Sequence, residues 1–249
     1  MKSDLKLSIL PQPNDTTCGP TCLHAVYHYF GDIVDLDEVI NEVTTLGTGG
    51  TLAVYLACHA LRRGYSASLF TYNLHFFDPT WFTLPLHDLR AKLLAQATLK
   101  KDDDRLLAVA RGYIDFLALG GMLHFEDLSR SLIRTPLRKS LPIITGLSST
   151  YLYRAMREYG PHGQDDDLRG EPTGHFVVLS GYDTDERTID VADPYHKNPV
   201  SSDHHYSIHI DRVISAILLG VLTHDANFLI LQPPKHLKKA HRANSHRCQ

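Results

Sequence analysis

A helix that begins at a cysteine is predicted near the amino end of this 249-residue chain. Pro20 suits the first helical turn, where a missing N–H sacrifices no hydrogen bond, and Thr16 and Thr17 are acceptable N-caps. The apolar residues that follow recur at helical spacing: Leu23, Val26, Tyr27 and Phe30. Gly31 then closes the run, as is typical of a helix C-terminus. The pattern therefore places the Cys18 thiol at a helix N-terminus.

The position of this thiol favours nucleophilic chemistry. Unpaired N–H groups and the positive end of the helix dipole stabilise a thiolate, which is the nucleophilic form of cysteine. Gln12 lies six residues upstream of Cys18 and can place a side-chain amide beside the same thiol. An amide there could donate to the oxyanion that forms when a thiolate attacks a carbonyl carbon. Such a nucleophile also needs a base and a group that orients the base.

The best candidates for these two groups lie far downstream, in two strand-like runs. Residues 173–183 and 188–194 flank a short polar turn, which predicts an antiparallel hairpin. Counting outward from the turn places His175 almost opposite Asp193, and opposed residues lie within hydrogen-bonding reach. Pro194 cannot continue a central strand, so we expect Asp193 at a strand end. The hairpin is thus predicted to supply a His–Asp pair.

These blocks together resemble the papain-like cysteine peptidases. The similarity lies in Gln-x5-Cys-Gly, followed much later by Gly-His-Phe-Val-Val-Leu and Asp-Pro-Tyr. More narrowly, the chain resembles the bacteriocin-processing (double-glycine leader) peptidase family and its stand-alone bacterial relatives. The resemblance implies an α+β fold in which an N-terminal helix bearing the cysteine packs on an antiparallel sheet bearing the histidine and aspartate. It also implies four roles: Cys18 as nucleophile, His175 as base, Asp193 as orienting group and Gln12 as oxyanion-hole donor.

The chain departs from the family pattern at several points. Thr17 precedes the cysteine where many relatives carry Asp, and Pro20-Thr21 stands where transporter-linked members tend to have Ala-Ala. A helical elaboration is expected over about residues 77–140, which makes the chain longer than the usual peptidase domain. No membrane or nucleotide-binding segment follows, so the resemblance does not extend to a transporter partnership.

Composition predicts one folded unit and gives no sign of other partners. We expect a single peptidase domain over residues 1–234, and a basic, disordered tail over residues 235–249. The net charge of −3 does not suggest a nucleic-acid partner, and no apolar run is long enough to span a membrane. The N-terminus lacks the apolar core of a signal peptide, so a cytoplasmic location is expected. The four cysteines show neither a disulfide framework nor metal-knuckle spacing, and no cofactor or metal is predicted.

The remaining elements follow from periodicity and turn signals. Helices are predicted from Asp35, from Leu52 to about Arg63, over 86–99, 106–119, 125–133 and 211–219, and strands over 65–74, 141–147 and 228–231.

Two local features allow alternative interpretations. The glycine-rich loop over residues 45–51 either forms a wall of the substrate cleft or only connects two helices. Cys22, one helical turn after Cys18, either acts as a resolving thiol or is a buried packing residue. The sequence favours the packing role for Cys22.

The predicted activity is hydrolysis of a peptide bond through a thioester on Cys18, with a peptide or protein as substrate, in the processing of a peptide precursor. One alternative is an acyl or γ-glutamyl-type transferase, which would use the same thioester but pass the acyl group to an amine or thiol. A second alternative is a peptide-binding module that no longer catalyses. Identifying the acceptor would separate the first two, and the reactivity of Cys18 would test the third.

Overall fold

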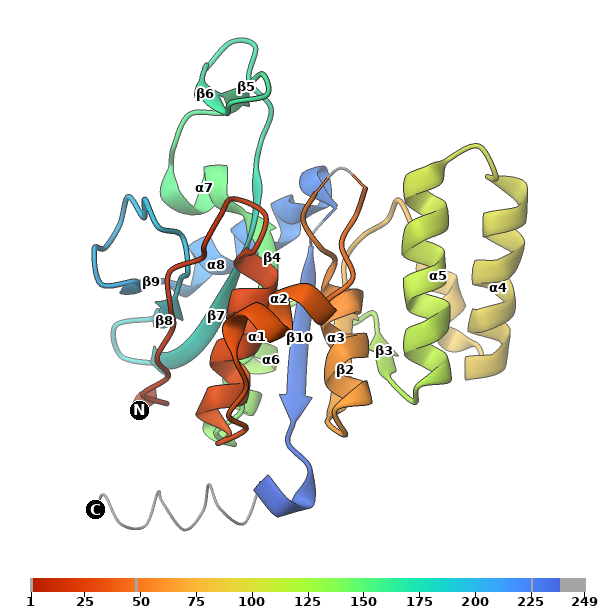
Figure 1. Ribbon diagram of the computed structural model, residues 1–249, viewed down its shortest axis with the longest axis horizontal. Helices are drawn as coiled ribbons and strands as arrows, with labels where there is room; N and C mark the ends of the chain where they lie inside the picture. The colour runs from red at the N-terminus through yellow and green to blue at the C-terminus, as the bar shows by residue number, and fades with distance from the viewer. Residues whose placement is uncertain (1, 48, 225, 238–249) are drawn as a thin grey trace.

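The computed structural model describes residues 2–47, 49–224 and 226–237. Its centre is a mainly antiparallel eight-stranded sheet with the strand order β3-β2-β10-β4-β7-β8-β9, and β1 pairs with part of β7 (Figure 1). The strands of this sheet are β1 (Lys2–Asp4), β2 (Ser66–Thr71), β3 (Met122–His124), β4 (Ile143–Ser148), β7 (Gly174–Asp183), β8 (Thr188–Ala192), β9 (His205–His209) and β10 (Asn227–Gln232).

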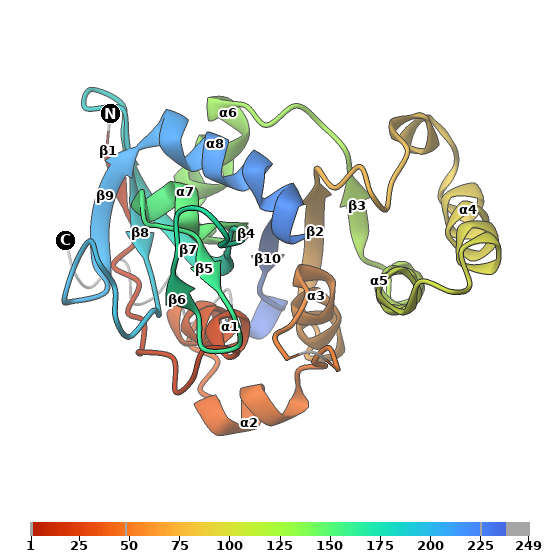
Figure 2. The same cartoon turned by 90° about the horizontal axis from the view of Figure 1, so that it is seen from above.

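Helices cover both faces of the sheet, which explains why its central strands are apolar on both sides (Figure 2). One face carries α1 (Cys18–Tyr29), α2 (Leu36–Glu42) and α3 (Ala53–Arg62), with α5 (Asp104–Ala118) beside α3. The other face carries α6 (Arg130–Arg138) and α8 (Ile210–Leu219), with the short α7 (Ser149–Tyr153) next to α8. The sequence predicted helices corresponding to α6 and α8, but it did not indicate that they form a second layer.

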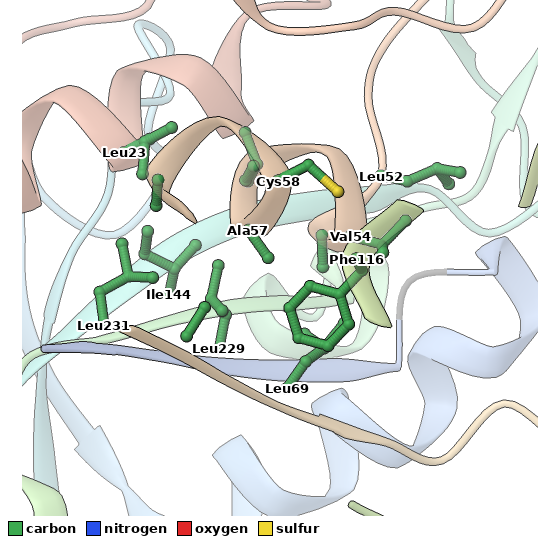
Figure 3. Close-up of a cluster of buried hydrophobic side chains, with 14 of the residues drawn as sticks. Leu23, Leu52, Val54, Ala57, Cys58, Leu69, Phe116, Ile144, Leu229 and Leu231 are labelled. Atoms are coloured by element: carbon green, nitrogen blue, oxygen red, sulfur yellow. The ribbon is translucent and has the colours of Figure 1, made fainter. Parts of the chain in front are cut away.

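Buried side chains form a core on each face of the sheet. On the first face, residues from three helices meet residues from the strands beneath them, as Figure 3 shows: Leu23, Val54, Ala57 and Phe116 against Leu69, Ile144, Leu229 and Leu231. The second core lies under α6 and α8 and includes Ile133, Val177, Val213 and Phe228. All of these side chains are less than 3% exposed to solvent, so hydrophobic burial fixes both layers against the sheet.

The helix that carries Cys18 begins and ends where the sequence predicted. Cys18 is its first residue, and Gly31 follows with a φ of 79°, a left-handed conformation that glycine adopts at little cost. Thr17 occupies the N-cap position but does not cap the helix with its side chain. Its hydroxyl instead donates to the backbone oxygen of Asn14 at 3.0 Å. The first-turn N–H groups are therefore not capped by this side chain.

The middle of the chain is helical, as expected, with one difference in position. Helix α4 (Leu86–Leu99) and α5 form a pair that projects beyond β3 (Figures 1 and 2), after the 3₁₀ helix η1 (Pro79–Thr83). The third helix was predicted over 125–133 but is α6, which starts at Arg130. Ser129 sets this start by accepting a hydrogen bond from the N–H of Leu132 at 3.1 Å. Phe125 is not helical and packs on Phe82.

The predicted hairpin forms, but its register differs from the simple count. Strands β7 and β8 pair as far as Val178 opposite Ala192, with an irregularity between Leu179 and Gly181. Asp183 pairs with Thr188, so the turn is centred between Asp185 and Glu186, and the β-bulge then shifts the later pairs by one residue. His175 lies beyond the last β7–β8 pair and is opposite Leu147 of β4 instead. His175 and Asp193 are therefore not directly opposed, although both lie at the same end of the hairpin.

Short strands make up much of what the sequence did not indicate. They are β1, β3 and the small pair β5 (Glu158–Tyr159) and β6 (Gln164–Asp165), which lies within the predicted loop before His175. The 3₁₀ helix η2 (Gly220–Thr223) precedes β10. Within the described residues, no helix has the length and apolar character needed to cross a membrane. Most of the predicted basic tail, residues 238–249, lies outside the described residues.

Candidate active site

Cys18 lies at the N-terminal end of α1, and its side chain is partly exposed as a free thiol. The start of this helix packs closely on its neighbours because residue 19 has no side chain. A Cβ atom at Gly19 would lie 2.6 Å from Thr51 Cγ2 and 3.4 Å from Phe176 Cδ2. One turn later, the Cys22 thiol donates to the backbone oxygen of Phe176 at 3.3 Å. Both contacts place Cys18 beside the start of β7.

His175 and Asp193 form a buried ion pair beside this thiol. The Nε2 atom of His175 lies 2.8 Å from Oδ1 of Asp193, and the two side chains are 7% and 0% exposed. An ionised carboxylate only accepts hydrogen bonds, so Nε2 carries the proton. Cys18 also helps to raise the pKa of the imidazole, and because Nε2 is engaged with Asp193, Nδ1 is the nitrogen left for the thiol.

The electrostatics of the pair favour a protonated imidazole. Burial by itself would lower the pKa of His175, but the hydrogen bond and charge of Asp193, together with Cys18, raise it to about 10. Burial by itself would raise the pKa of Asp193, but its hydrogen bonds and the charge of His175 hold that pKa below its usual value. An imidazolium at neutral pH is the partner that a thiolate requires.

Two tyrosine hydroxyls complete the surroundings of Asp193. Tyr153, the last residue of α7, donates to Asp193 Oδ2 at 2.7 Å, and Tyr206 of β9 donates to the same oxygen at 2.8 Å. The backbone N–H of Tyr195 donates to Oδ1 at 3.0 Å. The sequence analysis missed both tyrosines, because they lie 40 and 13 residues from Asp193 and belong to no recognisable motif.

Gln12 is joined to the same end of the hairpin. Its backbone N–H donates to the oxygen of Pro194 at 2.8 Å, and its side chain is buried. The amide Nε2 donates to the oxygen of Asn14 at 2.8 Å, and Oε1 is buried with no partner within the described structure. An amide nitrogen carries two hydrogens, so one N–H is left over after the bond to Asn14. The predicted role of Gln12 as an oxyanion donor stays a prediction.

The glycine-rich loop approaches the start of α1. A Cβ atom at Gly49 would lie 3.2 Å from Thr16 Cγ2, and Thr51 contacts Gly19 as described above. This loop therefore does more than connect two helices, and its position favours the cleft-wall interpretation. Cys22 is completely buried, and burial is the main cause that raises the pKa of its thiol, which agrees with a packing role. Across the described residues, no three His, Cys, Asp or Glu side chains group as metal ligands would.

A thiol at a helix N-terminus, beside an imidazole and a carboxylate on an antiparallel sheet, is the arrangement of a papain-like cysteine peptidase. One solved structure has the fold of this class. The chain is similar to a putative C39-like peptidase from Bacillus anthracis, with a TM-score of 0.52 and 12% sequence identity over 94% of this chain and 98% of that one. At this level of identity the similarity shows the fold, and the predicted papain-like α+β class is confirmed.

Two further solved structures match with lower TM-scores. The peptidase domain of Streptococcus ComA, a bifunctional ABC transporter, gives 0.43 at 14% identity, over 92% of this chain and 99% of that chain. A double-glycine-motif protease from an AMS/PCAT transporter, solved in complex with the leader peptide, gives a TM-score of 0.45 at 14% sequence identity. The match covers 93% of this chain and 95% of that chain. No protein-family model and no curated protein matches the sequence.

Proposed function

We propose that this protein is a cysteine peptidase that cleaves a peptide bond through a thioester on Cys18. The observation that carries the proposal is the 2.8 Å pair between His175 and Asp193, with the Cys18 thiol at the start of α1 helping to raise the pKa of the imidazole. The Bacillus anthracis structure supports a peptidase-like fold. The substrate would be a peptide or protein, and processing of a peptide precursor is the role suggested by the sequence resemblance.

The mechanism follows from the position of each group. The Cys18 thiolate attacks the carbonyl carbon of the scissile bond, and the negative charge moves to the carbonyl oxygen. The backbone N–H of Cys18 and the Gln12 amide donate to this oxyanion. His175 gives its proton to the leaving amine as the C–N bond breaks, which leaves the acyl group on sulfur. The neutral imidazole then takes a proton from water, whose oxygen attacks the thioester and releases the acid and the thiol.

We also propose a domain organisation for the rest of the chain. Residues 1–234 would act as one peptidase domain, with α4 and α5 as an addition at the far end of the sheet from Asp193 (Figure 1). The cytoplasmic location expected from the sequence stays a prediction.

The alkylation of Cys18 by iodoacetamide tests the proposal. We expect Cys18 to react rapidly at pH 6, because a protonated His175 stabilises the thiolate. An ordinary thiol is only about 0.3% ionised at that pH. The imidazolium persists until the pH rises through the His175 pKa of about 10, so the ion pair should span neutral pH. Peptide mass spectrometry would follow each cysteine, and the buried Cys22 and Cys58 serve as internal controls.

The variant His175→Ala supplies the decisive comparison. Its Cys18 should react at pH 6 at least about 10-fold more slowly than in the parent, and the two rates should converge above pH 9. If Cys18 is inert in the parent, or reacts with the same pH profile in both proteins, the ion pair is not functional and the binding-module alternative gains support. Once reactivity is established, a peptide library with and without added amines separates hydrolysis from acyl transfer.

A further inference from the structure

The two carboxylate oxygens of Asp193 accept hydrogen bonds from two different sets of donors. Oδ1 accepts from His175 Nε2 at 2.8 Å and from the N–H of Tyr195 at 3.0 Å. Oδ2 accepts from the hydroxyls of Tyr153 and Tyr206, at 2.7 and 2.8 Å. Asp193 is 0% exposed, so these protein donors take the place of hydration around the charge.

We propose that Tyr153 and Tyr206 are positioning residues that hold Asp193 charged and turned toward His175. The inference rests on the proposed function, since it assigns these tyrosines a part in forming the Cys18–His175 ion pair. Both hydroxyls hydrogen-bond to Asp193. Both act through the carboxylate, which orients the imidazole.

The geometry explains how two hydroxyls that donate to Oδ2 also set the position of Oδ1. Burying a carboxylate oxygen without hydrogen-bond donors costs free energy. Oδ2 therefore stays where both tyrosine hydroxyls can donate to it. Because the carboxylate is planar, fixing Oδ2 also fixes the direction in which Oδ1 meets the imidazole. The backbone of Asp193 is held as well: its N–H donates to the oxygen of His204 at 2.9 Å, and its oxygen accepts from His204 Nδ1 at 3.0 Å.

The same hydroxyls favour the ionised form of Asp193. Hydrogen bonds to a charged acceptor are stronger than those between neutral groups. Charge on Asp193 stabilises the imidazolium of His175, which in turn stabilises the thiolate of Cys18. Losing a hydroxyl should therefore weaken the ion pair, although the hydrogen bond that is lost is made to Asp193 and not to Cys18.

The two tyrosines approach from different elements and allow independent tests. Tyr153 comes from α7, and its ring centroid lies 6.4 Å from that of His175 and 6.2 Å from that of Tyr195, on which it stacks. Tyr206 comes from β9, on the far side of β8 from β7. A Tyr→Phe change keeps each ring and removes only the hydroxyl.

The experiment measures the pH profile of Cys18 alkylation by iodoacetamide in Tyr153→Phe, Tyr206→Phe and the double variant. We expect the midpoint of the profile to move up by about half a pH unit in each single variant and by about one unit in the double variant. At a pH well below the midpoint, these shifts correspond to rates about 3-fold and about 10-fold lower. Circular dichroism and thermal melting confirm that each variant is folded, and the single variants keep the test valid if the double variant does not fold.

Tyr182→Phe is the matched control. Tyr182 is a fully buried tyrosine of β7 whose hydroxyl has no partner within the described structure, so its removal deletes a buried phenol without affecting Asp193. Its pH profile should match that of the parent. In an Asp193→Ala background, the Phe substitutions should no longer shift the midpoint, because the carboxylate through which they act is absent.

The outcomes distinguish the inference from the function on which it depends. If the parent shows the reactive thiol but the folded Tyr→Phe variants keep its pH profile, the positioning role is wrong and the peptidase proposal stands. The same conclusion follows if Tyr182→Phe shifts the midpoint equally. A parent without a reactive Cys18 overturns both proposals.

Discussion

The residue after the proposed nucleophile shows how a single side chain can set the geometry of the site. Gly19 lies under Thr51, and the built Cβ-to-Cγ2 distance of 2.6 Å is shorter than van der Waals contact. Thr51 cannot easily move away, because its hydroxyl donates to the oxygen of Thr44 at 2.8 Å and a β-branched side chain has few rotamers. Any side chain at position 19 therefore displaces either the loop or the start of α1.

Gly19→Ala should lower the free energy of unfolding by about 1–2 kcal/mol, because overpacking outweighs the gain in helix propensity. It should also slow the alkylation of Cys18. The added substitution Thr51→Ser removes the obstructing methyl group and keeps the hydroxyl. In a double-mutant cycle followed by denaturant unfolding, the pair should show a favourable coupling of about 1 kcal/mol. Additive effects of the two substitutions would show that the contact is not the cause.

At this scale, the sequence indicates only those site residues that local spacing brings together. Cys18 and Gln12 share one short segment, and His175 and Asp193 share one hairpin, so local patterns indicated them as candidates. Tyr153 and Tyr206 reach Asp193 through the packing of α7 and the pairing of β9 with β8. No periodicity or motif in a single sequence indicates that these residues lie close together in space.

Among the elements, α3 and α5 approach each other most closely at a glycine. A Cβ atom at Gly112 of α5 would lie 2.7 Å from Tyr55 Cε1 and 2.9 Å from Val54 Cγ1. The Tyr55 hydroxyl donates to the oxygen of Ala108 at 3.0 Å, which fixes the ring against α5. This contact joins the helical pair α4–α5 to the layer that covers the sheet.

Gly112→Ala should destabilise the protein by about 1–3 kcal/mol, because the extra methyl group forces the two helices apart. Arg111→Ala, at an exposed neighbouring position of α5, is the control and should change stability by no more than about 0.5 kcal/mol. Alkylation of Cys18 should be unchanged in both variants. Denaturant unfolding provides the measurement, and a Gly112→Ala variant as stable as the parent would contradict the close packing.

The sequence predicted whole elements better than their ends and pairings. Long amphipathic segments such as α5 were found because many residues contribute to the periodicity. The start of α6 was placed five residues too early, since one cap, Ser129, decides it. The register of β7 and β8 was also wrong, because the turn is centred between Asp185 and Glu186, later than the count along the chain placed it. Edge strands such as β3 have three residues, too few to show alternation.

In the whole molecule, the protection of backbone amides from hydrogen exchange should decrease from the middle of the sheet to its edges. β10, β4 and β7 each lie between two other strands, and β4 is buried along its whole length. β3 and β9 are at the two ends of the strand order, and the β5–β6 pair stands outside the sheet. Local opening should therefore be rarest in the centre.

Amide hydrogen exchange measured by mass spectrometry at pH 7 would test this order. Peptides covering residues 143–148, 174–179 and 227–232 should exchange slowest, and those covering 122–124, 158–165 and 205–209 fastest. The two end strands, β3 and β9, are covered by separate peptides, so each can be compared with the central strands on its own. Equal rates in β4 and β9 would disagree with the strand order.

The position of β10 has a consequence for the order of synthesis. This strand pairs with β2 over six residues on one side and with β4 over four on the other, so it joins the two parts of the sheet. A ribosome makes the chain from its amino end, and a nascent chain that ends before residue 227 has β2 and β4 but not the strand between them. Cys18 and His175 both precede this strand in the chain, so the two parts of the sheet can be joined only after both residues have been made.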